Sequence, residues 1–123
     1  IEHLAALRAI PGLYVMRPCD GVEATECWQI ALNTITGPSV LALTRQNVLT
    51  QRTEQHDDEN KCRKGAYILR SENNDGAPQA VLFASGSEAE IAMQAAEKLA
   101  AQKVDVRVVS VPCFELFFAH DRA

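Results

Sequence analysis

The sequence contains two strand–helix–strand patterns, at residues 13–44 and 80–109. In the second, the apolar run Ala80–Ala84 predicts a buried strand, residues 87–102 repeat apolar side chains at the helical period, and residues 104–109 predict another strand. A crossover of this kind is right-handed and pairs its two strands in parallel. The sequence therefore predicts an α/β fold in which each pattern forms a parallel strand pair covered by a helix.

The first pattern has the same order. Residues 13–16 predict a short buried strand, and residues 39–44 predict a strand that is apolar on both faces, as a central parallel strand is. Between them Asp20 opens a helix, and Glu23 three residues later completes a capping box. The helix is expected to bury a stripe of apolar side chains at helical spacing: Ala24, Cys27, Trp28, Ala31 and Leu32.

An almost entirely polar stretch, residues 46–64, separates the two patterns. So long a polar stretch is unusual inside a compact domain, so we interpret residues 47–64 as a linker outside both hydrophobic cores. Residues 1–46 and 65–123 would then be parts of two three-layer α/β/α domains with mainly parallel sheets. Each part is small for a complete domain, and the chain begins at Ile1 within an expected helix, so we expect a segment of a longer protein.

Composition excludes several classes of partner. The net charge is −4, and the sequence has no basic patch with interleaved aromatic residues. Both observations argue against nucleic acid as a partner. No apolar run approaches the roughly 20 residues that span a bilayer, so no membrane segment is expected. The four cysteines form no C-x-x-C pair and no disulfide framework. We expect reduced thiols in a cytoplasmic protein, with Cys27 and Cys113 as small core residues.

Arg45 is the first candidate for a binding residue, because it directly follows the predicted strand 39–44. Ligands of open α/β sheets bind at the carboxyl ends of the strands. The donor fork of a guanidinium suits a phosphate or a carboxylate. From position alone, a surface arginine paired with a neighbouring carboxylate is an equally good interpretation.

The turn Ser85–Glu88 is a weaker candidate, because small residues before a helix N-terminus can bind an anion. A helix cap made by Ser87, with Glu90 at the capping-box position, explains the same residues and is the preferred interpretation.

The histidines give no site. The run His-Asp-Asp-Glu at residues 56–59 lies on the linker, where nothing fixes a metal geometry. His3 and His120 stand at no informative spacing from a carboxylate or a cysteine. The residues by themselves therefore predict no catalytic group and no metal site in this segment.

Six strings of the sequence resemble strings that transketolases carry in the same order, among them RPADGNE, L(S/T)RQN and ATGSE. They are residues 1–11 (IEHLAALRAIP), 15–23 (VMRPCDGVE), 43–47 (LTRQN), 64–69 (KGAYIL), 84–88 (ASGSE) and 106–112 (VRVVSVP). Cys19, Val22 and Ser85 stand where the family usually has Ala, Asn and Thr, and none of these changes touches a catalytic group.

The resemblance implies that residues 1–46 end the pyrimidine-binding domain and that residues 65–123 begin the C-terminal domain. Intact transketolase, a cytoplasmic homodimer, moves a two-carbon ketol unit from a ketose phosphate to an aldose phosphate in the pentose phosphate pathway and, in autotrophs, the Calvin cycle. It uses thiamine diphosphate and a divalent metal, Mg or Ca. The arginine of the family's RQN string contacts the sugar phosphate, which implies that role for Arg45.

The family's catalytic glutamate and histidine, and its GDG…NN segment for metal and diphosphate, have no counterpart in these strings. Asn73–Gly76 shows the reversed order and falls in the wrong domain. The resemblance therefore implies no catalytic residue, no cofactor and no metal bound by this segment alone. A related ketol transferase such as dihydroxyacetone synthase, and a non-enzymatic α/β interaction module, remain alternatives.

Overall fold

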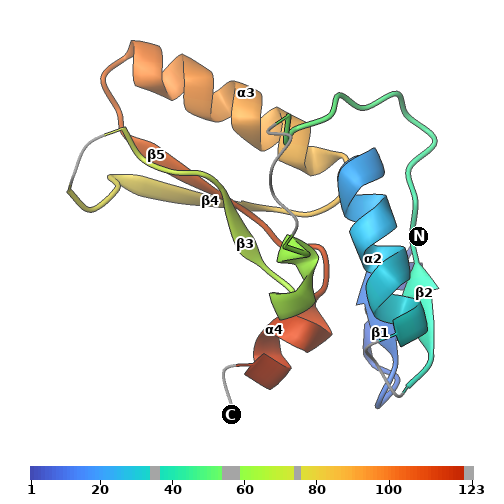
Figure 1. Cartoon of the computed structure of the whole chain (residues 1–123). Helices are drawn as coiled ribbons and strands as arrows, with labels where there is room; N and C mark the ends of the chain where they lie inside the picture. Colours follow the sequence, from blue (N-terminus) through green and yellow to red (C-terminus); the bar gives the residue numbers. More distant parts are fainter. Residues whose placement is uncertain (34–36, 54–58, 74–75, 121–123) are drawn as a thin grey trace.

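The computed structural model describes residues 1–33, 37–53, 59–73 and 76–120 (Figure 1). Its elements, in chain order, are α1 (His3–Arg8), β1 (Tyr14–Met16), α2 (Gly21–Asn33), β2 (Ser39–Leu41), the 3-10 helix η1 (Lys61–Lys64), β3 (Tyr67–Arg70), β4 (Ala80–Ala84), α3 (Glu88–Ala101), β5 (Val106–Ser110) and α4 (Phe114–His120). The fold is α/β, as predicted. Within the described ranges, no helix combines the length and apolarity needed to cross a membrane.

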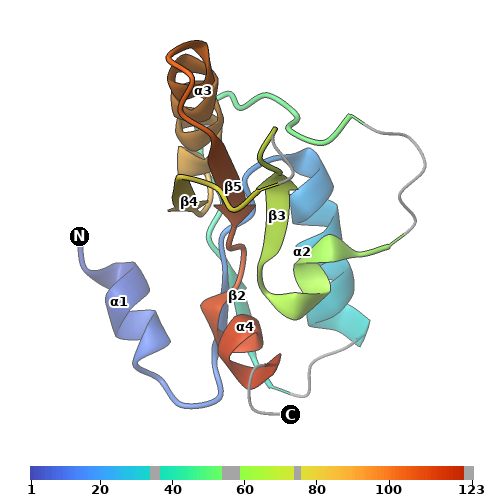
Figure 2. The ribbon, with the colours of Figure 1, turned by 90° about the vertical axis from the view of Figure 1, so that its left-hand side faces the viewer.

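The first strand–helix–strand unit forms a two-stranded parallel sheet, as predicted. Tyr14 pairs with Ser39 and Met16 with Leu41, and the amide of Ala42 continues the ladder by donating to the carbonyl of Met16 at 2.8 Å. Figure 2 shows α1 on one side of this sheet and α2 on the other. The strand carboxyl ends therefore meet at one edge, next to the start of α2.

The second unit forms a three-stranded sheet in the order β3-β5-β4. β4 and β5 pair in parallel, as predicted, whereas β3 pairs with β5 antiparallel. One face of this sheet is covered by α3, where Ala96 packs with Val106 and Val108 (Figure 1). The opposite face exposes apolar side chains of the strands, and Phe83 in β4 is 69% exposed.

The two units share a hydrophobic core. One buried cluster combines side chains of both: Met16, Cys27, Ile30, Cys62 and Cys113. Backbone hydrogen bonds join the same parts. The amide of Arg17 donates to the carbonyl of Pro112 at 2.8 Å and its carbonyl accepts from the amide of Gly86 at 3.0 Å, and Met16 and Cys113 form an antiparallel bridge.

The segment expected to be a linker contributes to this core, which corrects the expectation that it lies outside both cores. Cys62 is fully buried, and its amide donates to Glu26 Oε2 at 3.1 Å. Arg52 forms an ion pair with Glu26 at 2.5 Å. Because polar groups of the connector pair with α2, they bring Cys62, one of the few apolar residues of the stretch, into a buried position.

The buried face of α2 also differs from the expected stripe. The buried residues are Glu23, Cys27 and Ile30, whereas Trp28 is 52% exposed and Leu32 is 74% exposed. The expected stripe excluded glutamate because a charged side chain is rarely fully buried unless it is paired. Here hydrogen-bond donors from distant strands hold Glu23 inside, and the helix is rotated accordingly.

Candidate functional site

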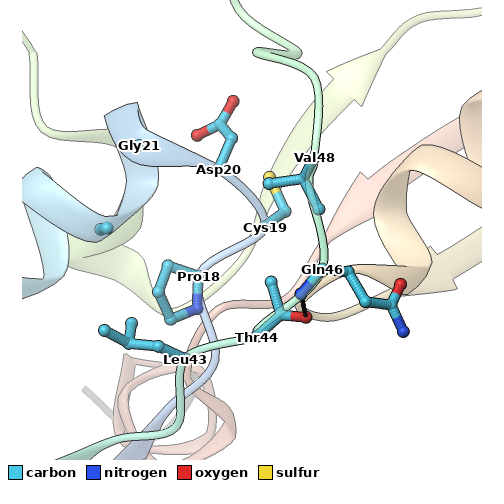
Figure 3. A pocket seen from close by; sticks show the side chains of 9 residues that line it. Pro18, Cys19, Asp20, Gly21, Leu43, Thr44, Gln46 and Val48 are labelled. Atoms are coloured by element: carbon cyan, nitrogen blue, oxygen red, sulfur yellow. Dashed lines mark hydrogen bonds between the residues drawn. The ribbon is translucent and has the colours of Figure 1, made fainter.

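A pocket of about 200 Å³ lies at the carboxyl ends of β1 and β2 (Figure 3). One wall is the turn from β1 into α2, and the other is the segment that follows β2. The lining residues are Pro18, Cys19, Asp20, Gly21, Ala24, Leu43, Thr44, Gln46 and Val48. This is the edge of an open α/β sheet where ligands bind.

Asp20 forms part of the first wall and is only 5% exposed. Its Oδ1 accepts the amide hydrogen of Glu23 at 2.9 Å, which confirms the Asp20 half of the predicted capping box, and its Oδ2 accepts from the amide of Gln51 at 2.8 Å. The other half differs, because the Glu23 side chain accepts from the amide of Cys19 and not from that of Asp20. The capping pattern in the sequence gave Asp20 a structural role only. Asp20 lines a pocket only because the segment after β2 forms the opposite wall, and the local capping pattern contains no information about that segment.

Cys19 precedes the cap, and its thiol is not a nucleophile. The side chain is 3% exposed. Burial, and then the charges of Glu23 and Asp20, raise the pKa of Cys19 far above its ordinary value. Because the thiolate is the reactive form of a cysteine, Cys19 serves this wall as a small packed side chain.

The strand predicted to run to residue 44 ends at Leu41, so Arg45 does not directly follow it but lies in the segment after β2. Arg45 does not line the pocket, although its neighbours Thr44 and Gln46 do. Its side chain is exposed. Within the described part of the chain it has no hydrogen bond and no ion pair. Among the described residues, then, no carboxylate neutralises Arg45, whose two neighbours in the chain line the pocket.

The turn before α3 is built differently from the expected cap. The side chain of Ser87 makes no capping hydrogen bond. Glu90 accepts instead from the amide of Leu49 at 3.2 Å. Gly86 has a φ of +62°, and its carbonyl accepts from the amide of Ala89 at 3.1 Å. The predicted Ser87/Glu90 box is wrong because this turn is closed by backbone hydrogen bonds.

The arginine beside that turn is already paired. Arg17 Nη2 donates to Glu88 Oε2 at 2.8 Å, so a cation from the first unit and a carboxylate of the first turn of α3 neutralise each other. Arg17 is therefore not free to bind an anion at this turn, where Ser85 Oγ is buried without a hydrogen-bond partner among the described residues.

The histidines do not form a site among the described residues. His3 begins α1 and His120 ends α4, and both are exposed. Most of the run at residues 56–59 falls outside the described residues. In the ranges that the structure covers, no three His, Cys, Asp or Glu side chains are grouped as metal ligands would be.

The pocket does not fit a diphosphate with its metal. Among the described residues that line it, Asp20 is the single carboxylate and there is no lysine or arginine. Both oxygens of Asp20 already accept backbone amide hydrogens. A magnesium-bound diphosphate needs oxygen ligands that are free to coordinate the ion, and this lining does not provide them.

Comparisons with known proteins divide the chain at the connector. The family model described as "Transketolase, pyrimidine binding domain" matches residues 1–51. The model described as "Transketolase-like TK C-terminal domain" matches residues 65–123.

Individual relatives agree along the whole chain. A transketolase of Cereibacter sphaeroides is 53% identical over 97% of this chain, which spans 18% of that protein. The crystal structure of transketolase from Campylobacter jejuni superposes with a TM-score of 0.83 at 39% identity, covering 97% of this chain and 18% of that one. A Pichia stipitis transketolase in complex with sedoheptulose 7-phosphate gives a TM-score of 0.81 at 34% identity, covering 95% and 16%.

The chain thus spans less than one fifth of the length of these relatives. Two successive transketolase domain models, the same order of strings and the same fold all agree. The chain belongs to the transketolase family.

Proposed function

We propose that residues 1–123 work as one part of a longer transketolase, which transfers a two-carbon ketol unit from a ketose phosphate to an aldose phosphate. The observation that carries this proposal is the match of both halves, in order, to two domains of that enzyme family. In this proposal residues 1–46 belong to the pyrimidine-binding domain, 47–64 connect, and 65–123 belong to the C-terminal domain.

Thiamine diphosphate and a divalent metal would be held by residues outside this segment. The pyrimidine-binding model supports the cofactor, and the lining of the pocket supports its attachment elsewhere, because it has no cation for the diphosphate. The enzyme would be a cytoplasmic homodimer of the pentose phosphate pathway.

Arg45 would bind the phosphate of the sugar. Arg45 is exposed and unpaired among the described residues, in the segment after β2, where Thr44 and Gln46 line the pocket. A guanidinium binds a phosphate through two parallel charge-assisted hydrogen bonds. The Pichia stipitis relative, whose structure contains sedoheptulose 7-phosphate, supports a phosphorylated sugar as the ligand.

The test is ketol transfer by the full-length protein. With thiamine diphosphate and magnesium present, it should convert a ketose phosphate and an aldose phosphate into an aldose phosphate two carbons shorter than the donor and a ketose phosphate two carbons longer than the acceptor. Omission of the cofactor should abolish the reaction. A correctly folded protein that is saturated with the cofactor but transfers no ketol unit would refute the proposal.

A further inference from the structure

A fully buried glutamate lies directly behind the pocket. Glu23 in α2 has 0% exposure and accepts three hydrogen bonds. Its Oε2 accepts from the amide of Cys19 at 2.7 Å. Its Oε1 accepts from the hydroxyl of Tyr67 at 2.8 Å and from Ser110 Oγ at 2.5 Å.

The two carboxylate oxygens face different parts of the protein. Oε2 holds Cys19, which belongs to the pocket wall. Oε1 holds Tyr67 of β3 and Ser110 of β5, which belong to the segment that matches the C-terminal domain model. Glu23 itself is not among the lining residues, so any effect on a ligand passes through Cys19 and its neighbour.

The backbone of Glu23 holds the same wall a second time, since its amide donates to Asp20 Oδ1 at 2.9 Å. Side chain and main chain of one residue therefore fix both Cys19 and Asp20. Displacement of Glu23 would therefore loosen both residues.

The hydroxyl of Tyr67 stays protonated and can therefore donate to Glu23. Burial, and then the charge of Glu23, raise the pKa of Tyr67 well above its ordinary value, so the phenol remains protonated. In the part of the chain that the structure describes, Glu23 forms no ion pair. A buried carboxylate without a cation depends on its hydrogen-bond donors, and the loss of one is costly.

We propose that Glu23 is a positioning residue that transmits the placement of the β3–β5 sheet to the pocket wall at residues 18–21, and so sets the affinity of the pocket for the sugar phosphate. The substrate part of this inference rests on the proposed function. The coupling between the two sheets rests on the contacts of Glu23 alone.

The decisive variants are Tyr67→Phe and Ser110→Ala, because each removes one donor to Oε1 without touching the pocket. Glu23→Gln is the third variant, since it keeps the shape and replaces one acceptor oxygen by a donor. Glu26→Gln is the matched control. Glu26 lies on the same helix and also pairs with distant residues, through Arg52 and the amide of Cys62, but it holds no part of the wall.

Two measurements on the full-length holoenzyme separate the possibilities. Amide hydrogen exchange of the peptide that covers residues 17–24 reports the wall directly. Steady-state kinetics with a ketose phosphate report KM and kcat. The wall keeps its hydrogen bonds to Glu23 Oε2 and from the Glu23 amide in both variants. Exchange of this peptide and KM should therefore rise by about two- to tenfold in Tyr67→Phe and Ser110→Ala, less than the lost bond costs in overall stability. The value of kcat should stay within about twofold.

The inference is overturned if exchange of residues 17–24 is unchanged in both Tyr67→Phe and Ser110→Ala, or if Glu26→Gln raises it equally. These two variants decide the question even if Glu23→Gln does not fold. If no variant and no parent protein transfers a ketol unit, the proposed function fails, while the exchange data still decide the role of Glu23.

Discussion

Glu23 Oε1 lies 2.5 Å from Ser110 Oγ, although 87 residues separate the two in the sequence. Both residues are fully buried. The contact joins α2 of the first unit to the end of β5 in the second, at the edge where the pocket lies. A polar pair of this kind, excluded from water, ties the geometry of one sheet to that of the other.

The same carboxylate oxygen accepts from the hydroxyl of Tyr67 at 2.8 Å, and the strength of this second contact can be measured in a double-mutant cycle. Tyr67→Phe should lower the free energy of unfolding by about 1.5–3 kcal/mol, because a hydrogen bond to a charged group contributes that much. In a Glu23→Gln background the same substitution should cost less than about 1 kcal/mol. Urea unfolding of the four proteins gives the coupling, and additive effects would show that the two side chains do not interact.

Arg45→Ala in the full-length enzyme should raise KM for a phosphorylated sugar by about 10- to 100-fold, as expected for a charge-assisted contact of about 1.5–3 kcal/mol. KM for the non-phosphorylated sugar should change little. Arg63→Ala is the control, since Arg63 is an exposed arginine in η1. Equal losses for both sugars would give Arg45 a structural role instead.

Gly65→Ala should destabilise the protein by at least about 2 kcal/mol, because an L-residue with left-handed backbone and an overpacked site each cost about 1 kcal/mol or more. Gly65 has a φ of +80°, and an added Cβ would overlap the carbonyl oxygen of Cys113 and the amide nitrogen of Phe117. Gly76→Ala, where an added Cβ meets nothing within 4 Å, should change stability little. Urea unfolding compares the two variants.

The four cysteines should resist a thiol reagent in the folded chain at pH 8 and react rapidly in denaturant. All four are buried and free. Burial raises the pKa of Cys113 to about 12, and a hydrogen bond with Cys27, followed by burial, raises the pKa of Cys62. Little thiolate of Cys62 and Cys113 therefore forms at pH 8, and burial shields all four thiols from the reagent. Release of the chromophore from an aromatic disulfide reagent measures the rate, and rapid labelling without denaturant would contradict the burial.

Glu72 should make the stability depend on acid pH. Its hydrogen bond with Arg107 lowers the pKa of Glu72 from 4.5 to about 2. A carboxyl with a lowered pKa in the folded state stabilises the fold above its unfolded pKa and loses this contribution as the pH falls through the folded value. The stability difference between the parent and Glu72→Gln should thus be constant above about pH 5 and vanish near pH 2.

Unfolding of both proteins over this pH range measures the difference. Glu97→Gln, which changes an exposed glutamate on α3, should show no such dependence. A difference that persists at pH 2 would show that the ionic pair is not its cause.

Local sequence patterns predicted β1, β2, β4 and β5, the helices α2 and α3 and the cap at Asp20, because these depend on neighbours in the chain. They also predicted both parallel pairs, since a strand–helix–strand order restricts the pairing. The antiparallel pairing of β3 with β5 and the 3-10 helix η1 were not predicted. Neither produces a repeating pattern of apolar residues in the sequence from which it could be predicted.

The misassigned residues share a physical cause. Glu23 and Cys62 are buried through partners that lie 44, 87 or 36 residues away in the chain. Trp28 was expected inside because an apolar side chain at helical spacing usually faces a core. Long-range polar contacts, which no window of the sequence contains, decided which face of α2 turned inward.

The candidate site was predicted only in part. The strand-end location followed from the pattern, whereas the pocket wall at residues 18–21 became visible only with β1 and β2 side by side, and Arg45 is not among the lining residues. The assignment of Arg45 to a sugar phosphate stays a prediction.

The antiparallel bridge between Met16 and Cys113 bears on how the gene could be divided. The bridge, the shared core and the Glu23 contacts all cross between the two halves, so these halves have contacts of their own that do not depend on the peptide bonds between them. A polypeptide that ends before residue 54 and one that begins after residue 58, produced separately, should associate and form the same folded unit, as complementing fragments do.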